Sequence, residues 1–265
     1  FEIAADGHAI EFYVFLPRHL KDYVESQIYA HYPNVEITEA ADYAHDVDVS
    51  PELQVAGTTL QLLNKEFFPI KTFPNFEVDP LAGITGVLSN VALGERIWIQ
   101  YLVEPADAGW TQRAMAYVKA VKKGLDPYPK LSFSPAIVLR GLLGFGKEVV
   151  EQALHGPPKA PEAGAKPKEA PPLSGPEEQG IKGVDTKVTK LGFKTLIRVV
   201  ALAPTRDVAT SKIMNVVGAF KQFNLTNLNG FAATDVIADR SVFDEYRRRS
   251  MKGGYVLNVE ELASV

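Results

Sequence analysis

The sequence predicts an α+β protein made of two modules of the ferredoxin-like kind, each an antiparallel sheet with helices on one face. Residues 10–40 have the pattern of a strand, a helix and a second strand, and residues 195–223 repeat the order of apolar strand, Pro with Arg, and helix. A Pro-rich stretch lies between them. We therefore predict a first module at 1–131, an amphipathic helix at 132–155, a Pro- and Ala-rich linker at 156–176 and a second module at 177–265.

The first module is expected to begin with a β-hairpin, because short apolar runs flank an Asp-Gly turn at positions 6 and 7. A helix follows from Arg18, with apolar residues at helical spacing, and Pro33 ends it. Alternating residues at 35–38 predict a return strand with one wet face. This unit is the most clearly punctuated stretch of the chain.

The rest of the first module is predicted to contain two strands and two helices. Strands are expected at 55–63 and 96–103. A helix at 81–93 begins at Asp79 and Pro80, and we expect it to be well buried because it is almost uncharged. Another helix is expected at 110–123, before Gly124.

The stretch from Pro135 to Leu154 is apolar through Phe145 apart from Arg140, and then becomes amphipathic. This composition predicts a helix that lies on a membrane surface or against a partner, with packing in a core as the alternative. The apolar side chains that would face the membrane or partner are Leu139, Leu142, Leu143, Phe145, Val149 and Val150.

The second module is predicted to alternate helices and strands. A helix ends at Gly192, a strand covers 193–202, and helices cover 207–223 and 239–251. A short strand at 255–259 follows. The order of strands and helices in the second module matches that of the first module only loosely.

Charge is distributed unevenly along the chain. Residues 1–105 contain 5 Lys or Arg and 16 Asp or Glu, whereas residues 106–265 contain 23 and 16. Nucleic-acid binding is therefore plausible only in the second half. The absence of Cys excludes disulfides and thiolate metal sites. Because the first residue is Phe, we expect the sequence to be a piece of a longer chain.

The sequence contains no complete catalytic or metal motif. Residues 141–148, GLLGFGKE, resemble a phosphate loop, but Glu148 follows Lys147 where Ser or Thr is needed to hold Mg²⁺. His45 with Asp42, Asp46 and Asp48 matches no standard metal loop. We therefore expect no enzyme activity, no cofactor, no metal and no small-molecule substrate.

A basic run near the end of the chain is the best candidate for nucleic-acid or partner contact. Arg247, Arg248, Arg249 and Lys252 lie together, and Tyr246 and Tyr255 flank them. The alternative is a solvated helix face that docks onto an acidic neighbour.

Five phrases of the sequence carry a family resemblance. They are QIYAHYP (27–33), RIWIQYLV (96–103), GAFKQFN (218–224), NLNGF (227–231) and YVLNVEEL (255–262). With them, nearly the whole chain resembles the accessory region that precedes the motor in bacterial conjugative DNA transfer, or type IV secretion coupling, ATPases. The resemblance implies a region at the cytoplasmic face of the membrane, held there by segments outside this sequence, with the motor beyond Val265.

The first hypothesis is therefore a non-catalytic assembly or substrate-recruitment domain of such an ATPase. Its partners would be neighbouring domains or subunits of the motor, with DNA and a membrane surface as further candidates. The alternative is a nucleic-acid-binding module that uses the basic second half. A third hypothesis is an enzyme that uses the incomplete phosphate loop.

Overall fold

The computed structural model describes residues 1–46, 52–125 and 172–265, which form a mixed α+β structure around one antiparallel sheet. The strands are β1 (Glu2–Asp6), β2 (Ile10–Tyr13), β3 (Gln54–Leu62), β4 (Arg96–Pro105), β5 (Gly192–Ala203), β6 (Phe231–Ala233) and β7 (Tyr255–Asn258). The helices are η1 (Arg18–Leu20), α1 (Lys21–His31), α2 (Tyr43–Asp46), η2 (Phe73–Asn75), α3 (Pro80–Leu88), α4 (Gly109–Lys122), α7 (Gly175–Val188), α8 (Arg206–Phe220), η3 (Lys221–Phe223), α9 (Arg240–Arg247) and α10 (Val259–Leu262).

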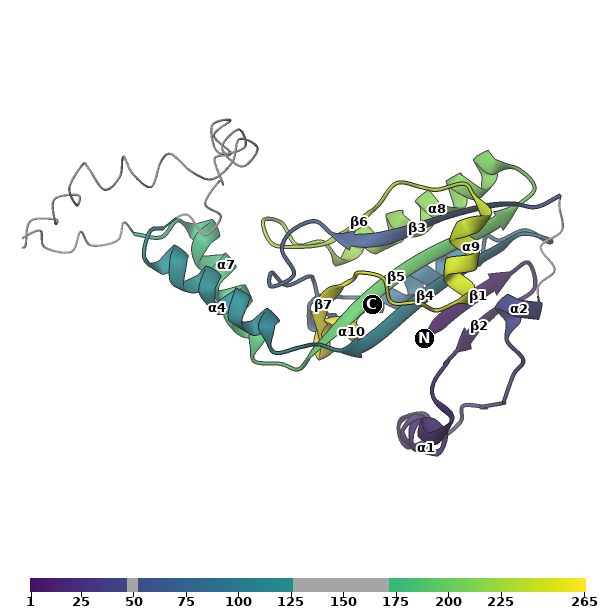
Figure 1. Ribbon diagram of the computed structural model, residues 1–265, viewed down its shortest axis with the longest axis horizontal. Coiled ribbons are helices and arrows are strands. Elements are labelled where there is room, and N and C mark those ends of the chain that lie inside the picture. Colours follow the sequence, from purple (N-terminus) through teal and green to yellow (C-terminus); the bar gives the residue numbers. More distant parts are fainter. Residues whose placement is uncertain (47–51, 126–171) are drawn as a thin grey trace, which may run out of the picture.

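The seven-stranded sheet has the order β2-β1-β4-β5-β3-β6, and β7 pairs with the first residues of β5 (Figure 1). The central strand β5 comes from the predicted second module, yet its neighbours β4 and β3 come from the first. The two predicted modules therefore do not have a sheet each, because strands from both halves of the chain share one sheet.

One face of the sheet is covered by α3 and α8, whose apolar side chains pack on the odd-numbered residues of β4 and β5. Asp79 caps α3, since its Oδ1 accepts a hydrogen bond from the backbone N–H of Leu81 at 2.9 Å. The expectation that this helix is well buried was wrong. Only Ile84 and Leu88 are buried, because α3 lies at the outside of its layer.

The opposite face is covered by α9 and α2. Phe243 and Tyr246 of α9 pack on Trp98 of β4. Gly57 of β3 allows α9 to approach the sheet, because an added Cβ would lie 2.2 Å from a methyl carbon of Val242. The sheet is thus enclosed between two helical layers.

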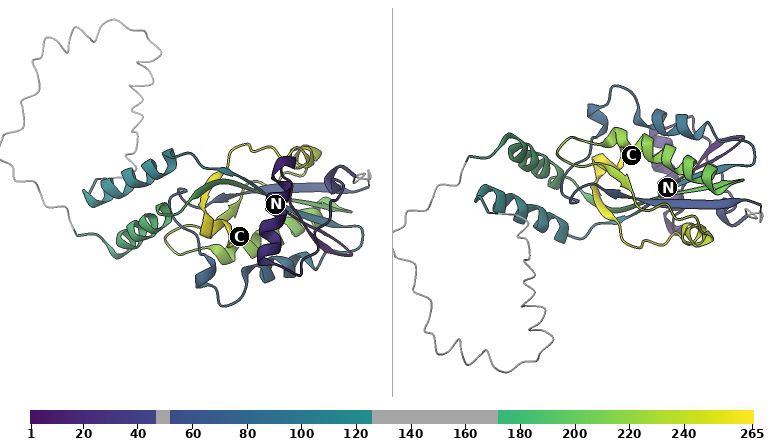
Figure 2. Two further views of the ribbon diagram at one scale, coloured as in Figure 1. Left: turned by 90° about the horizontal axis from the view of Figure 1, so that it is seen from below. Right: turned by 90° about the horizontal axis from the view of Figure 1, so that it is seen from above.

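Helices α4 and α7 lie side by side and project beyond the end of the sheet (Figures 1 and 2). They bury a common seam, to which Phe67 and Phe68 are added from the loop after β3. The buried residues of α4 are Trp110, Ala114, Val118 and Val121, and Tyr117 packs partly buried beside the seam. We call this pair of helices the hairpin.

A buried ion pair attaches the hairpin to the last helix of the chain. Lys187 of α7 and Glu261 of α10 are almost fully buried, with 2.9 Å between the Nζ and Oε2 atoms. Glu261 also accepts hydrogen bonds from the backbone N–H groups of Ile70 and Asn258. Burial lowers the pKa of Lys187 below its ordinary value, against the attraction of Glu261.

Most predicted elements are confirmed within a few residues, including the β-hairpin formed by β1 and β2 and the helix after Arg18. The predicted return strand at 35–38 was wrong, because these residues are a loop that does not reach the sheet. The helix at 135–154 and most of the linker at 156–176 lie outside the described residues, although α7 already begins at Gly175. Among the described residues, no helix is long and apolar enough to cross a membrane.

Candidate interaction site

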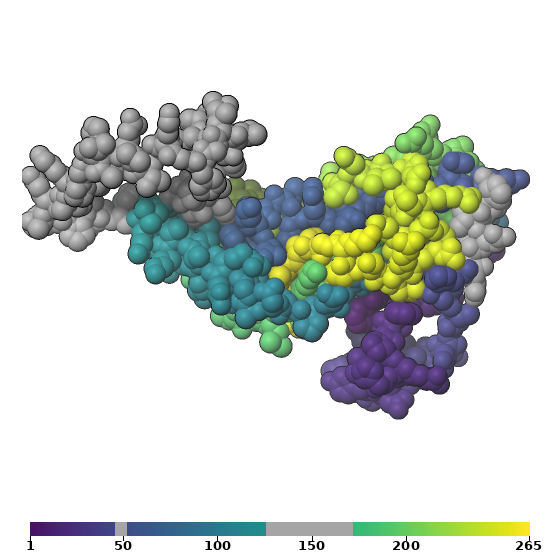
Figure 3. All heavy atoms as spheres, in the orientation of Figure 1, coloured from purple at the N-terminus to yellow at the C-terminus, as the bar shows by residue number. Residues whose placement is uncertain are grey.

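Residues 14–41, which we call the arm, leave the edge strand β2 and stand apart from the sheet (Figures 1 and 3). The arm consists of η1, α1 and the loop that follows. No residue of the arm, all of which the structure describes, is buried. Its large exposed apolar side chains are Val14, Phe15, Leu20, Tyr23, Tyr29, Tyr32 and Val35. This many exposed apolar side chains in one short segment indicate a surface for association.

Helix α1 lacks the packing that normally stabilises a helix of its length. It has 11 residues and none of them is buried. In water, an isolated helix shorter than about 12–15 residues is marginal, and most helices in proteins depend on tertiary packing. Within the chain, Lys21 donates a hydrogen bond to Glu39 of the following loop at 3.0 Å, an exposed contact worth little. A partner that covers α1 would supply the missing packing.

Both ends of the arm are held by one side chain, Arg249. Its Nε and one Nη atom donate to Glu2 at 2.9 and 3.0 Å, and its two Nη atoms donate to Asp42 at 2.6 and 2.9 Å. The guanidinium also lies 4.5 Å from the centre of the Phe15 ring. Phe15 is the second residue of the arm and Asp42 follows its last residue, so Arg249 holds both ends. We call Glu2, Asp42 and Arg249 the anchor.

The position of Arg249 follows from how α9 ends. Arg249 has a positive φ of 48°, the left-handed conformation common just after a helix, and its N–H donates to the carbonyl of Tyr246 at 3.0 Å. This turn directs the side chain back toward β1. A non-glycine residue rarely adopts this conformation, and here the two bidentate ion pairs offset its cost.

The anchor continues into a buried polar network on the α9 face of the sheet. Glu2 also accepts hydrogen bonds from Gln100 at 2.7 Å and from the Tyr43 hydroxyl at 3.0 Å. The Tyr43 and Tyr246 hydroxyls are 2.7 Å apart, and burial raises the pKa of both. Glu2 therefore has four donors, as a buried carboxylate requires.

The opposite charges of the anchor stabilise one another. The hydrogen bond from Arg249 holds the pKa of Asp42 below its ordinary value. Burial alone would lower the pKa of Arg249, but its hydrogen bonds to Asp42 and Glu2 raise it above the ordinary value. Asp42 and Arg249 therefore form a charged pair at neutral pH.

The structure separates the members of the predicted basic run. Arg249 uses its guanidinium N–H groups for protein acceptors, with a further contact to the Arg247 carbonyl at 3.4 Å. Arg247 contacts His45 Nδ1 at 3.1 Å and lies over the Phe243 ring. Lys252 pairs with Glu245 at 3.0 Å, and Arg248 is exposed. Only Arg248 and Lys252 point outward enough to meet a phosphate without a rearrangement.

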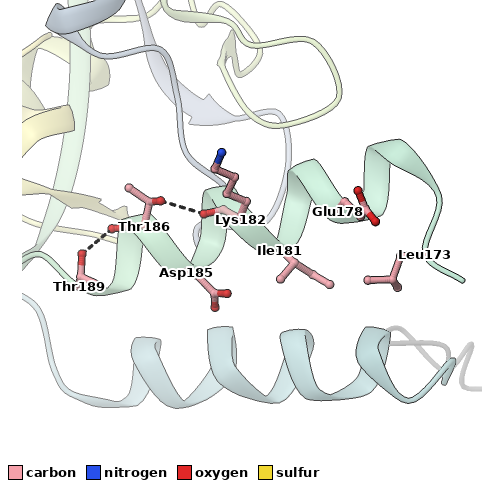
Figure 4. A pocket seen from close by; sticks show the side chains of 7 residues that line it. All are labelled: Leu173, Glu178, Ile181, Lys182, Asp185, Thr186 and Thr189. Atoms are coloured by element: carbon pink, nitrogen blue, oxygen red, sulfur yellow. Dashed lines mark hydrogen bonds between the residues drawn. The ribbon is translucent and has the colours of Figure 1, made fainter. Parts of the chain in front are cut away.

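A groove of about 510 Å³ lies beside the hairpin (Figure 4). In Figure 4, Ile181 and Asp185 point toward α4, while Lys182 points away from it. Two hydroxyls in the groove are already used, since Thr186 and Thr189 donate to carbonyls of their own helix. The lining has no pair of groups arranged for acid–base or nucleophilic chemistry.

The described residues form no arrangement that supports the metal or nucleotide site considered from the sequence. Among residues 1–46, 52–125 and 172–265, no group of three His, Asp or Glu is arranged around a possible ion. Asp42 points to Arg249, and Asp48 lies outside the described residues. The incomplete phosphate loop and the six apolar residues of the predicted membrane or partner helix, Leu139, Leu142, Leu143, Phe145, Val149 and Val150, also lie outside them.

Sequence reasoning missed Glu2, Asp42 and Tyr43 as parts of this site. The sequence showed an acidic loop around Asp42, but the ion pair to Arg249 spans 207 positions. The sequence predicts that the apolar residues of the arm pack within a strand–helix–strand unit. The number of apolar side chains in the arm was a usable signal. One amphipathic helix and one strand cannot bury all of these side chains unless other elements pack on them.

Comparison with known proteins gives a family and no described relative. A search of curated proteins and a search of solved structures each found no match. The model of one family, described as a domain of unknown function (DUF8128), matches residues 1–265. The chain therefore belongs to the DUF8128 family.

Proposed function

We propose that this chain is a non-catalytic assembly or substrate-recruitment domain that works through protein contacts. The observation that carries the proposal is the arm, an anchored segment whose apolar side chains are exposed along its length. The anchor holds both ends of the arm in place, so little of the binding free energy is lost in positioning it. Helix α1 then offers a partner apolar side chains that are not packed against the rest of the chain. A surface of this kind has no need of an active site.

The partner class follows from the resemblance described above. The domain would assemble with neighbouring domains or subunits of a translocation ATPase of the conjugative or type IV secretion kind, at the cytoplasmic face of a bacterial membrane. The arm has four acidic and two basic side chains, which disfavours an anionic bilayer as its main partner.

The nucleic-acid alternative has less support. Its strongest residue, Arg249, is engaged by two carboxylates, and a phosphate would have to displace Glu2 or Asp42. Arg248 and Lys252 alone provide a small basic surface, and Lys252 is already paired with Glu245. No particular observation favours DNA over protein.

We also propose that the centre of the fold is one ferredoxin-like unit in place of the two predicted. The order β3-α3-β4-β5-α8-β6 is the β-α-β-β-α-β order of that fold, and both helices lie on one face. In this interpretation β1, β2 and the arm are additions at the β4 edge. The hairpin is an insertion between β4 and β5.

Site-specific photo-crosslinking tests the assembly function. A photoreactive phenylalanine analogue replaces Tyr23, which is 65% exposed in the arm, in the natural full-length protein in its own cells. The control position is Met115 of α4, which is 50% exposed. We expect Tyr23 to crosslink to the translocation ATPase or its protein substrate, and Met115 not to. Crosslinks from Tyr23 to lipid or nucleic acid alone, or to nothing, would overturn the proposal.

A further inference from the structure

The outer surface of the α3 and α8 layer contains a groove with little charge. The groove measures about 460 Å³ and is lined by Val87, Asn90, Lys212, Met214, Asn215, Gly218 and Ala219. Only one of these residues is charged, and that one, Lys212, is paired with Glu95 at 2.8 Å. The outer face of a helical layer is normally polar and charged.

The surroundings of the groove are also poor in charge and expose apolar side chains. Residues 80–94 contain no charged side chain. Leu81, Leu93 and Met214 are exposed, and Leu93 is among the most exposed residues of the chain. At Gly86 and Gly218 an added Cβ would meet nothing within 4 Å, so the backbone there is open to close approach.

Helix α1 has the complementary features. Leu20, Tyr23, Val24 and Ile28 follow the i, i+3, i+4, i+8 spacing of one helical stripe. An apolar stripe of this kind fits a groove between two helices, a common mode of helix recognition. The charges agree in sign: acidic side chains exceed basic ones on the arm, whereas Arg206, Lys212 and Lys221 on and just after α8 outnumber Asp207 and Glu95, the partner of Lys212.

The anchor of the arm and the groove lie on opposite faces of the sheet. The anchor lies on the α9 face, since Glu2 and Gln100 are on the same side of β1 and β4 as Ala4 and Trp98. The groove lies on the outside of the α3 and α8 layer. The ends of the arm are therefore held on the face of the sheet that lies away from the groove of the same molecule.

We propose that α1 of one copy of this chain packs into the α3–α8 groove of a second copy. The contact is head-to-tail, because the arm and the groove are different surfaces, and each copy retains a free arm or a free groove for another. This inference rests on the proposed function, because it names the protein partner of the arm.

Engineered cysteines test the contact directly, because the chain has no Cys of its own. One copy carries Tyr23→Cys and the other carries Met214→Cys, both as the full 265-residue chain. The matched control replaces Met214→Cys by Met115→Cys, since the two methionines are 51% and 50% exposed. A disulfide between two such copies requires their Cα atoms to approach within about 7 Å.

We expect the Tyr23–Met214 mixture to form mixed disulfide about tenfold faster than the Tyr23–Met115 mixture, a ratio that corresponds to about 1.4 kcal/mol. Thermal unfolding of each variant verifies that it is folded. Equal rates in the two mixtures, disulfides between two Tyr23→Cys copies only, or no disulfide would overturn the inference. If Tyr23 still crosslinks to another protein in cells, the assembly function survives while its assignment to a second copy fails.

Discussion

The hairpin and the arm are two projections from one sheet, and they differ in what they bury. The hairpin helices share a buried seam that includes Val118 of α4 and Val184 of α7. The arm, fully described by the structure, has no buried residue. The first projection is stabilised by its own packing, whereas the second depends on what binds it.

The charged contacts of the two projections differ in the same way. The Lys187–Glu261 pair of the hairpin is buried on both sides. The anchor holds the arm only at its ends, and Asp42 is 29% exposed. Changes in the hairpin should therefore alter the stability of the whole fold, and changes in the arm should alter association.

The largest effect is expected from Lys187→Met. This change leaves the Glu261 carboxylate buried without its cation, and we expect the free energy of unfolding to fall by about 3–5 kcal/mol. Urea unfolding measures it. The control is Lys190→Met, which removes a partly exposed ion pair with Glu260 and should cost less than about 1 kcal/mol. Equal losses in both variants would contradict the difference in burial.

The next effect is expected from Arg249→Ala. Glu2 and Asp42 lose their shared donor, so the free energy of unfolding should fall by about 2–3 kcal/mol. The arm should also be cleaved faster by protease, because both of its ends are released. Arg248→Ala is the matched control and should change neither quantity. If protease cleaves the arm equally fast in both variants, Arg249 does not anchor it.

Acid should weaken the anchor. The pKa of Asp42 is lowered in the folded state, so its contribution is complete above the unfolded value of about 3.9 and is lost as pH falls through the folded value. The difference in unfolding free energy between the native chain and Asp42→Asn should therefore be constant near neutral pH and shrink below about pH 4. A difference that grows with acid would contradict the ion pair.

The smallest effect on stability is expected from Tyr23→Ala. Tyr23 is exposed, so the dilute chain should keep its free energy of unfolding within about 0.5 kcal/mol. Trp110→Ala in the hairpin provides the contrast and should cost about 3–5 kcal/mol. Calorimetry of both variants at low concentration measures the difference. A large loss in Tyr23→Ala would show that the arm contributes to the core.

Local structure was largely predictable from the sequence. Strands β3, β4 and β5 have strong apolar β-patterns, and Asp79 with Pro80 correctly predicted the start of α3. The pairing of β5 with strands on both sides was not predictable, because local patterns contain no information on which strands meet across 88 or more positions. The division into two modules relied on that missing information.

The candidate site was less predictable than the fold. The basic residues at 247–249 were noticed, but their three different environments depend on how α9 ends and on where Asp42 and His45 lie. Residues of the arm were expected to pack because their spacing is that of an amphipathic helix. Spacing identifies the apolar stripe of α1 and leaves open whether its partner belongs to the same molecule.

The position of β5 has a consequence for synthesis of the protein on the ribosome. Strands β3 and β4 both pair with β5 along much of their length, and β5 lies between them. Until Gly192–Ala203 has been translated, β3 and β4 lack this shared neighbour and expose unpaired strand edges. The sheet therefore cannot form until the second half of the chain has been synthesised. Chaperones that shield nascent strands should bind the first half during that interval.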